Sequence, residues 1–130
     1  MKPMIYIAGP MLGYPNYNRE AFNAAAKRLE EDWQVLNPVD FKRIIPCVED
    51  NGKPDPYRLS ALLNVERRAA TNADAIYLLK GWENSIGAKY ELAAYLSAHG
   101  GVGDILLEGG ENVNEERTRR DANVSSRIQA

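Results

Sequence analysis

The sequence predicts an α/β fold in which one parallel sheet carries helices on both faces. Short apolar runs at residues 4–8, 34–36, 75–79 and 104–107 have the length and composition of strands. Segments whose apolar residues recur at helical spacing separate these runs. Strands that alternate with helices favour parallel pairing through right-handed crossovers, so we expect a single Rossmann-like or flavodoxin-like domain.

The first half of the chain begins with MIYIA at residues 4–8, which Gly9-Pro10 closes and which fits a strand buried on both faces. Asn18 is placed to cap the following helix. The apolar positions of that helix are Phe22, Ala25, Ala26, Leu29 and Trp33. Residues 34–36 predict a brief strand. Residues 41–56 contain three prolines and one glycine without clear periodicity, so we expect an irregular excursion there.

The second half predicts a helix over residues 57–72, a buried strand at residues 75–79 and a turn that ends at Ser85. Ser85 is a suitable cap for a helix that runs to about Ala98. One side of this helix carries Ala88, Glu91, Leu92, Tyr95 and Leu96. After a last strand at residues 104–107, the polar residues 108–130 are expected to form a tail or an arm in an oligomer.

Composition excludes several classes of protein. The chain has 130 residues, 45% apolar and 26% charged, which suits one globular domain, and its formal charge of −2 provides no basic footprint for nucleic acid. The single Cys47 cannot form an internal disulfide or a cysteine metal cluster. The single His99 has no second histidine for a histidine-rich metal site, and we do not expect Ser-His-Asp chemistry. The N-terminal apolar run is too short for a signal peptide or a membrane span, so we expect a cytoplasmic protein without a membrane partner.

Two glycine-containing loops follow predicted strands, at residues 9–18 and 80–87. Ligands of open α/β sheets bind beyond the carboxyl ends of the strands. If the strands at residues 4–8 and 75–79 are neighbours, the two loops face each other, and Glu91 looks toward them from the second turn of its helix. The sequence therefore predicts a site between these loops.

The segments YIAGPM and ADAIYLLKGWENSIGAKYE resemble those of the nucleoside 2-deoxyribosyltransferase-like proteins. The pattern is most similar to a small branch common in phage and bacterial genomes, which is related to nucleoside 5'-monophosphate N-glycosidases. The likeness covers roughly residues 4–107 and includes Y-x-x-G-P together with S-x-G-x-x-x-E. It implies an enzyme that acts without metal or cofactor on the glycosyl bond of a nucleotide or nucleoside, and that works as a homo-oligomer, a dimer or larger.

The resemblance implies that Glu91 is the nucleophile, which attacks C1' of the sugar and holds a glycosyl ester. The chemistry agrees, because a carboxylate stabilises an oxocarbenium-like transition state and a covalent intermediate divides the reaction into two steps. Small neighbours at Gly87 and Ala88 would let the sugar approach the helix closely. The alternative is that Glu91 is an exposed helical residue without a chemical role.

The resemblance gives two further catalytic candidates. Tyr6 matches a tyrosine at the end of the first strand that orients the nucleophile, and its alternative is simple core packing. Glu66 falls where the family usually places an aspartate that binds the base or sugar and assists protonation of the leaving group. Its side chain is longer by one methylene, and an exposed glutamate paired with Arg67 or Arg68 is the alternative.

Ser85 bears on the substrate. Transferases that act on nucleosides resemble one another in an aspartate six residues before the nucleophile, whereas the monophosphate hydrolases have serine. A serine at a helix N-terminus suits an anion, so Ser85 favours a 5'-monophosphate, although it equally suits a simple cap. The first loop departs from those hydrolases, since Pro10-Met11-Leu12-Gly13 replaces their phosphate-binding serine and arginine. Asn16, Asn18 or Arg19 are the available substitutes.

The predicted site therefore has catalytic and substrate-binding groups on both loops. The catalytic residues are Glu91, Tyr6 and Glu66, and the substrate-binding residues are Gly9, Pro10, Met11, Ser85, Gly87, Trp82 and Asn18. Trp82 could stack on the base or cover the core. We expect hydrolysis of the N-glycosidic bond of a (deoxy)ribonucleoside 5'-monophosphate. Base exchange between nucleosides and non-catalytic nucleotide binding are the alternatives, and the sequence does not choose the base or the sugar.

Overall fold

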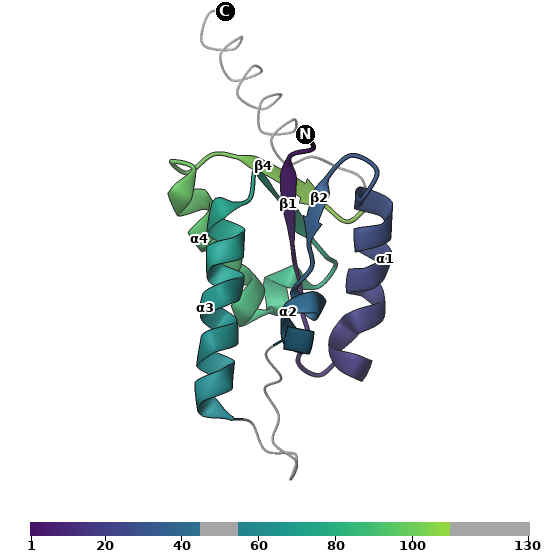
Figure 1. Cartoon of the computed structure of the whole chain (residues 1–130), viewed down its shortest axis with the longest axis vertical. Helices are drawn as coiled ribbons and strands as arrows, with labels where there is room; N and C mark the ends of the chain where they lie inside the picture. The colour runs from purple at the N-terminus through teal and green to yellow at the C-terminus, as the bar shows by residue number, and fades with distance from the viewer. Residues whose placement is uncertain (45–54, 110–130) are drawn as a thin grey trace, which may run out of the picture.

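The computed structural model describes residues 1–44 and 55–109, and the side chains of residues 42–44 are outside the description. The strands are β1 (Met4–Ala8), β2 (Gln34–Leu36), β3 (Ala75–Leu78) and β4 (Asp104–Leu107). The α-helices are α1 (Arg19–Leu29), α2 (Pro38–Ile44), α3 (Pro56–Asn72) and α4 (Ile86–Ala98), and two short helical turns are η1 (Pro15–Asn18) and η2 (Trp82–Asn84). Figure 1 shows the sheet between α1 on one side and α3 with α4 on the other.

The four strands of the described chain form one parallel sheet in the order β2-β1-β3-β4. Tyr6 in β1 pairs with Leu36 in β2 and with Ile76 in β3. The chain leaves β1 to reach β2 on one side and then crosses to β3 on the other, so the strand order reverses next to β1. The predicted α/β class, with a parallel sheet and helices on both faces, is confirmed.

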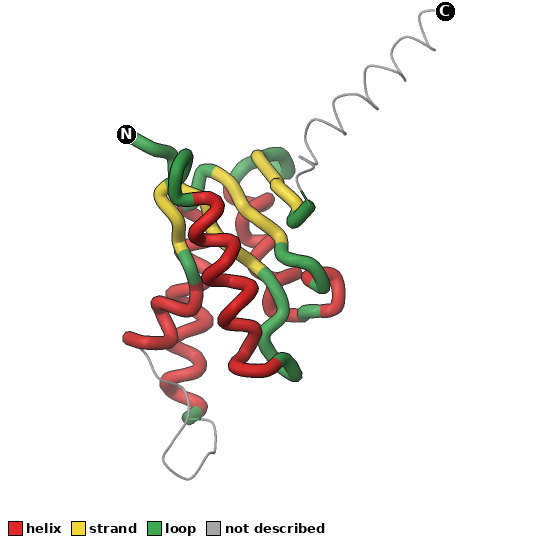
Figure 2. The backbone as a smooth tube through the Cα atoms, turned by 90° about the vertical axis from the view of Figure 1, so that its right-hand side faces the viewer, coloured by secondary structure: helices red, strands yellow, loops and turns green. Residues whose placement is uncertain are grey.

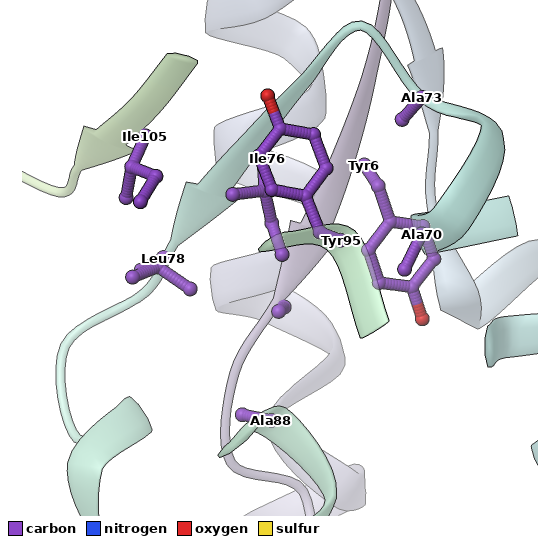
Figure 3. Close-up of a cluster of buried hydrophobic side chains, with 9 residues drawn as sticks. Tyr6, Ala70, Ala73, Ile76, Leu78, Ala88, Tyr95 and Ile105 are labelled. Carbon is purple, nitrogen blue, oxygen red and sulfur yellow. The ribbon is translucent and has the colours of Figure 1, made fainter. Parts of the chain in front are cut away.

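Alternation along the strands divides the core into two clusters, one on each face of the sheet. The first cluster, which packs under α3 and α4, contains Tyr6, Ala8, Ala70, Ala73, Ile76, Leu78, Ala88, Tyr95 and Ile105 (Figure 3). The second cluster, which packs under α1, contains Ile5, Ile7, Phe22, Ala25, Ala75, Tyr77 and Leu79. Figure 2 shows the sheet from the α1 side, with helices in front of the strands and behind them.

Tyr95 fixes the end of α4 to the sheet. Its hydroxyl donates to the carbonyl of Asp74 at 2.9 Å and accepts from the N–H of Asp104 at 2.8 Å. A Cβ atom at Gly103 would lie 2.5 Å from that hydroxyl oxygen, so only glycine leaves room for the ring. Asp74 in turn accepts from the N–H of Met4 at 2.7 Å, which ties the beginning of β1 to the same edge of the sheet.

Most predicted elements are confirmed within a residue or two, and α2 is the main correction. The irregular excursion expected at residues 41–56 is wrong over its first four residues, which belong to α2, and residues 45–54 lie outside the described part of the chain. Asn37 starts the helix, because its side chain accepts from the N–H of Val39 at 3.1 Å and Pro38 occupies the first helical position.

The first helix also begins and ends differently from expectation. Trp33 lies beyond α1, which ends at Leu29, although it still packs against the second cluster. Asn18 does not cap α1 with its side chain, because its backbone is left-handed (φ 64°) where a capping residue is extended. Its side-chain amide instead donates to the carbonyl of Pro10 at 2.9 Å.

No helix within the described ranges is long and apolar enough to cross a membrane.

Candidate active site

The two predicted loops lie side by side, because they leave the carboxyl ends of the neighbouring strands β1 and β3. A Cβ atom at Gly9 would lie 2.7 Å from the Cβ of Leu79, so the loops begin in close contact. Farther out, the Tyr14 hydroxyl oxygen lies 2.8 Å from the position a Cβ atom would take at Gly81. The prediction that these loops are neighbours is confirmed.

Helix α4 carries Glu91 on the side that faces the sheet. Ser85 caps the helix, since its hydroxyl oxygen accepts from the N–H of Ala88 at 3.2 Å. Ala88 and Tyr95 are buried in the first cluster, and Glu91 lies one turn from each of them. Glu91 is half-buried, and its Oε2 atom is buried. The interpretation of Glu91 as an exposed surface residue is therefore wrong.

Tyr6 and Glu66 reach the same region from other elements. Tyr6 is fully buried in the middle of β1, not at its end. Glu66 is 5% exposed, because it lies one turn from Leu62 and from Ala70 on the buried side of α3. The alternative of an exposed Glu66 that pairs with Arg67 or Arg68 is thus wrong.

Electrostatic interactions connect these three side chains. The charges of Glu91 and Glu66 both act on Tyr6, and the charge of Glu66 acts on Glu91. The structure therefore brings together three groups from β1, α3 and α4. Tyr6 is at least 60 positions away from both glutamates in the sequence. Sequence resemblance alone had grouped them as catalytic candidates.

The Tyr6 hydroxyl and the Glu91 carboxylate are neighbours, but their geometry is not that of a standard hydrogen bond. Neither the Tyr6 hydroxyl oxygen nor Glu91 Oε2 has a hydrogen-bond partner of standard geometry among the described residues. The phenol is nevertheless close enough to offset part of the rise in the Glu91 pKa. Catalytic hydrogen bonds are often long in unliganded sites and tighten when substrate binds.

Burial determines the protonation of the pair. Burial raises the pKa of Glu91 from 4.5 to about 8; the Tyr6 hydroxyl opposes this rise and the charge of Glu66 adds to it. Burial, and then the charges of Glu91 and Glu66, raise the pKa of Tyr6 well above 10.0. Tyr6 is therefore a neutral donor at physiological pH, and Glu91 titrates close to that range.

The predicted substrate-binding residues of the second loop have different surroundings. Gly87 is exposed, and a Cβ atom there would meet only the Ser85 hydroxyl oxygen, at 4.0 Å. The side chain of Ala88 is buried in the first cluster, and the expectation that a sugar approaches the helix closely at this position stays a prediction. Trp82 packs against the first cluster, which agrees with its interpretation as a cover of the core.

The predicted residues of the first loop make contacts that stabilise the loop conformation. Pro10 is buried and its carbonyl accepts from Asn18, while Met11 packs against the second cluster. Gly9 is required by the contact with Leu79. None of these contacts tests whether the loop binds a substrate.

Tyr14 lies at a contact between the two loops that sequence reasoning missed. It connects the two loops through Gly81, and 43% of the residue stays exposed in a chain segment between Gly13 and Pro15. An aromatic residue between a glycine and a proline, in a loop after a buried strand, was the available signal.

The described residues contain no group of three or more histidine, cysteine, aspartate or glutamate side chains positioned to hold a metal ion. The expectation of a reaction without cofactor stays a prediction.

Comparison with known proteins adds a family. No match was found among curated proteins. A family model described as "Domain of unknown function (DUF4406)" matches residues 3–100, which include Tyr6, Glu66 and Glu91 and extend through the end of α4. The chain therefore belongs to the DUF4406 family.

Proposed function

We propose that the protein hydrolyses the N-glycosidic bond of a (deoxy)ribonucleoside 5'-monophosphate, with Glu91 as the nucleophile. One observation carries the proposal: Glu91 is half-buried and directed at the sheet, beside the fully buried Tyr6 and the buried Glu66. A carboxylate at such a position costs folding free energy, which is typical of functional groups rather than of surface residues.

The proposed reaction has two steps. In the reactive form Glu66 is protonated and Glu91 is ionised: an oxygen of Glu91 bonds to C1' as the C1'–N bond breaks, and the base leaves with the proton of Glu66, which becomes a carboxylate. Water then attacks C1', the ester bond to Glu91 breaks, and the proton of that water returns to Glu66. Tyr6 stays neutral and orients the Glu91 carboxylate through its hydroxyl.

The surroundings of Ser85 support a monophosphate as substrate. The Ser85 hydroxyl oxygen accepts from Ala88, so its own hydrogen remains available to an anion. The helix N-terminus adds a favourable dipole, and Gly87 leaves open space beside it. An aspartate at this position would repel a phosphate, whereas serine does not.

A cytoplasmic homo-oligomer completes the proposal. Large apolar side chains are exposed on α3 and α4, namely Tyr57, Leu59, Leu63, Ile86 and Tyr90. Exposed apolar residues that gather on neighbouring helices favour an interface. Sedimentation of the full chain should give at least twice the monomer mass, and a monomer at micromolar concentration would contradict this part.

Chromatography of reaction mixtures tests the activity. The protein is incubated at about pH 8, where Glu91 is substantially ionised, with ribo- and deoxyribonucleoside monophosphates and with nucleosides. The proposal expects free base and phosphosugar from a monophosphate. Exchange with an added second base that outruns hydrolysis would indicate a transferase. Retention of intact nucleotide without turnover would indicate a binding module.

A further inference from the structure

The first loop contains an unusual backbone segment. Asn16, Tyr17 and Asn18 are consecutive and all left-handed, with φ of 51°, 54° and 64°. Residues with a side chain avoid this conformation, and when they adopt it they do so one at a time. Such backbone persists only where surrounding contacts hold it, and it is concentrated at ligand clamps and switches.

Hydrogen bonds within the loop hold part of this conformation. Asn18 donates from its side chain to the carbonyl of Pro10 at 2.9 Å. The N–H of Tyr17 donates to the carbonyl of Tyr14 at 3.1 Å, and the N–H of Tyr14 donates to that of Met11 at 3.3 Å. These bonds close the loop on itself but do not attach it to the segment that leads to Glu91.

Tyr14 and Pro10 make that attachment. The Tyr14 hydroxyl occupies the space beside the Cα of Gly81 that a side chain would fill, and the Pro10 Cγ lies 3.3 Å from the same position. Gly81 itself is left-handed at φ 86°. Gly81 begins the turn through η2 to Ser85, which caps the Glu91 helix. Tyr14 is 43% exposed, so it is held by partial burial as well as by the contact of its hydroxyl with Gly81.

We infer that Tyr14 is a latch that holds the first loop against Gly81, and that its release lets the left-handed turn relax and admits a ligand to the Glu91 site. A loop that contains a strained turn and is held at Gly81 by a tyrosine hydroxyl can serve as a two-state element that a ligand biases. The identity of the ligand rests on the proposed function. The latch itself does not.

Amide hydrogen exchange of the unliganded full chain tests the latch. Tyr14→Ala should speed exchange at residues 14–18 and 82–85 by about fivefold, the factor for a contact worth about 1 kcal/mol. Tyr57→Ala is the matched control, because Tyr57 is an exposed tyrosine of α3, and it should leave both segments unchanged. Unchanged exchange at residues 82–85 in Tyr14→Ala would overturn the inference.

A double-mutant cycle isolates the contact. Gly81→Ala places a Cβ against the Tyr14 hydroxyl and strains φ, whereas in the Tyr14→Ala background only the strain in φ and the approach to Pro10 Cγ at 3.3 Å remain. Gly81→Ala should therefore cost less stability in chemical denaturation when Tyr14 is alanine. Equal costs in the two backgrounds would contradict a seated hydroxyl.

Binding kinetics connect the latch to the ligand. In the Glu91→Gln background, which removes the proposed nucleophile, Tyr14→Ala should raise the association rate of a nucleoside 5'-monophosphate about fivefold relative to Tyr57→Ala. An unchanged rate would overturn the role in ligand entry. If neither Tyr14→Ala nor Tyr57→Ala bound the monophosphate, while amide exchange was still faster in Tyr14→Ala, the proposed substrate would be rejected and the latch retained.

Discussion

The two faces of the sheet differ in what they bury. Under α1, the second cluster combines aliphatic side chains with Phe22 and has no buried carboxylate among its members. Under α3 and α4, the first cluster surrounds Tyr6 and is joined by two acidic residues, Glu66 and Glu91. Burial under α1 stabilises the fold. Burial under α3 and α4 places ionisable groups in an environment that disfavours their charge. The difference supports the face under α3 and α4 as the one that carries the proposed chemistry.

The largest expected difference between the two faces is in the effect of substitutions on turnover. Glu91→Gln keeps the size of the side chain but removes its charge, so base release should fall by at least about 10³-fold, as for the loss of other covalent nucleophiles. Chromatography under saturating substrate measures it. Phe22→Leu on the opposite face is the matched control, and it should retain turnover per folded molecule. Turnover in Glu91→Gln close to that of the wild type would remove Glu91 from the mechanism.

The next effect concerns stability on the α1 face. Phe22→Ala leaves a cavity in the second cluster, where the ring is fully buried, and should lower the free energy of unfolding by about 3–5 kcal/mol. Urea denaturation followed by circular dichroism gives the value. A loss of less than about 1 kcal/mol would mean that this face collapses around the deletion.

A pH dependence should distinguish the other face. The folded protein keeps a proton on Glu91 that the unfolded chain has lost, because the pKa is 4.5 when unperturbed and about 8 in the fold. The folded state then binds more protons in this window, so stability should fall as pH rises from 4.5 to about 8, by on the order of a few kcal/mol.

Glu91→Gln supplies the comparison, since glutamine does not titrate and should flatten this part of the pH–stability curve. Denaturation midpoints at several pH values between these limits measure the slope. Parallel curves for the wild type and Glu91→Gln would show that Glu91 ionises in the fold as freely as in water.

The smallest effect should come from Tyr6. Its buried hydroxyl has no hydrogen-bond partner of standard geometry in the described part of the molecule, so Tyr6→Phe should change the free energy of unfolding by no more than about 1 kcal/mol, and in the stabilising direction. Turnover should fall about tenfold or more if the phenol orients Glu91. A large loss of stability with unchanged turnover would make Tyr6 a core residue only.

Sequence periodicity predicted the elements that repeat one pattern. MIYIA and AIYLL are apolar throughout and are bounded by turn residues, so both strands were identified with an error of at most one residue. Helix α2 was missed because Asn37-Pro38 suits the end of a strand as well as the start of a helix. Local residue chemistry does not separate these two meanings, whereas contacts with the rest of the fold do.

The site was less accessible from the sequence than the fold. Glu91 could be placed on the inner side of α4 because Ala88 and Tyr95 define that side. The same signal exists for Glu66, which lies one turn from Leu62 and from Ala70, but a surface role stays an alternative until the packing of α3 shows that it is buried. The contact between Tyr14 and Gly81 joins residues 67 positions apart and has no local pattern at all. Periodicity reports which side of an element is buried, but not which partner it meets.

The hydroxyl of Tyr95 has a consequence for how the chain tolerates change. It bridges Asp74 and Asp104 one helical turn beyond Glu91, in a space that exists because residue 103 has no side chain. A methyl group at position 103 would push the ring, and with it the carboxylate-bearing turn, away from β1. Gly103→Ala should therefore lower the free energy of unfolding and displace the turn that carries Glu91 at the same time, so this glycine restrains the proposed nucleophile from outside the site.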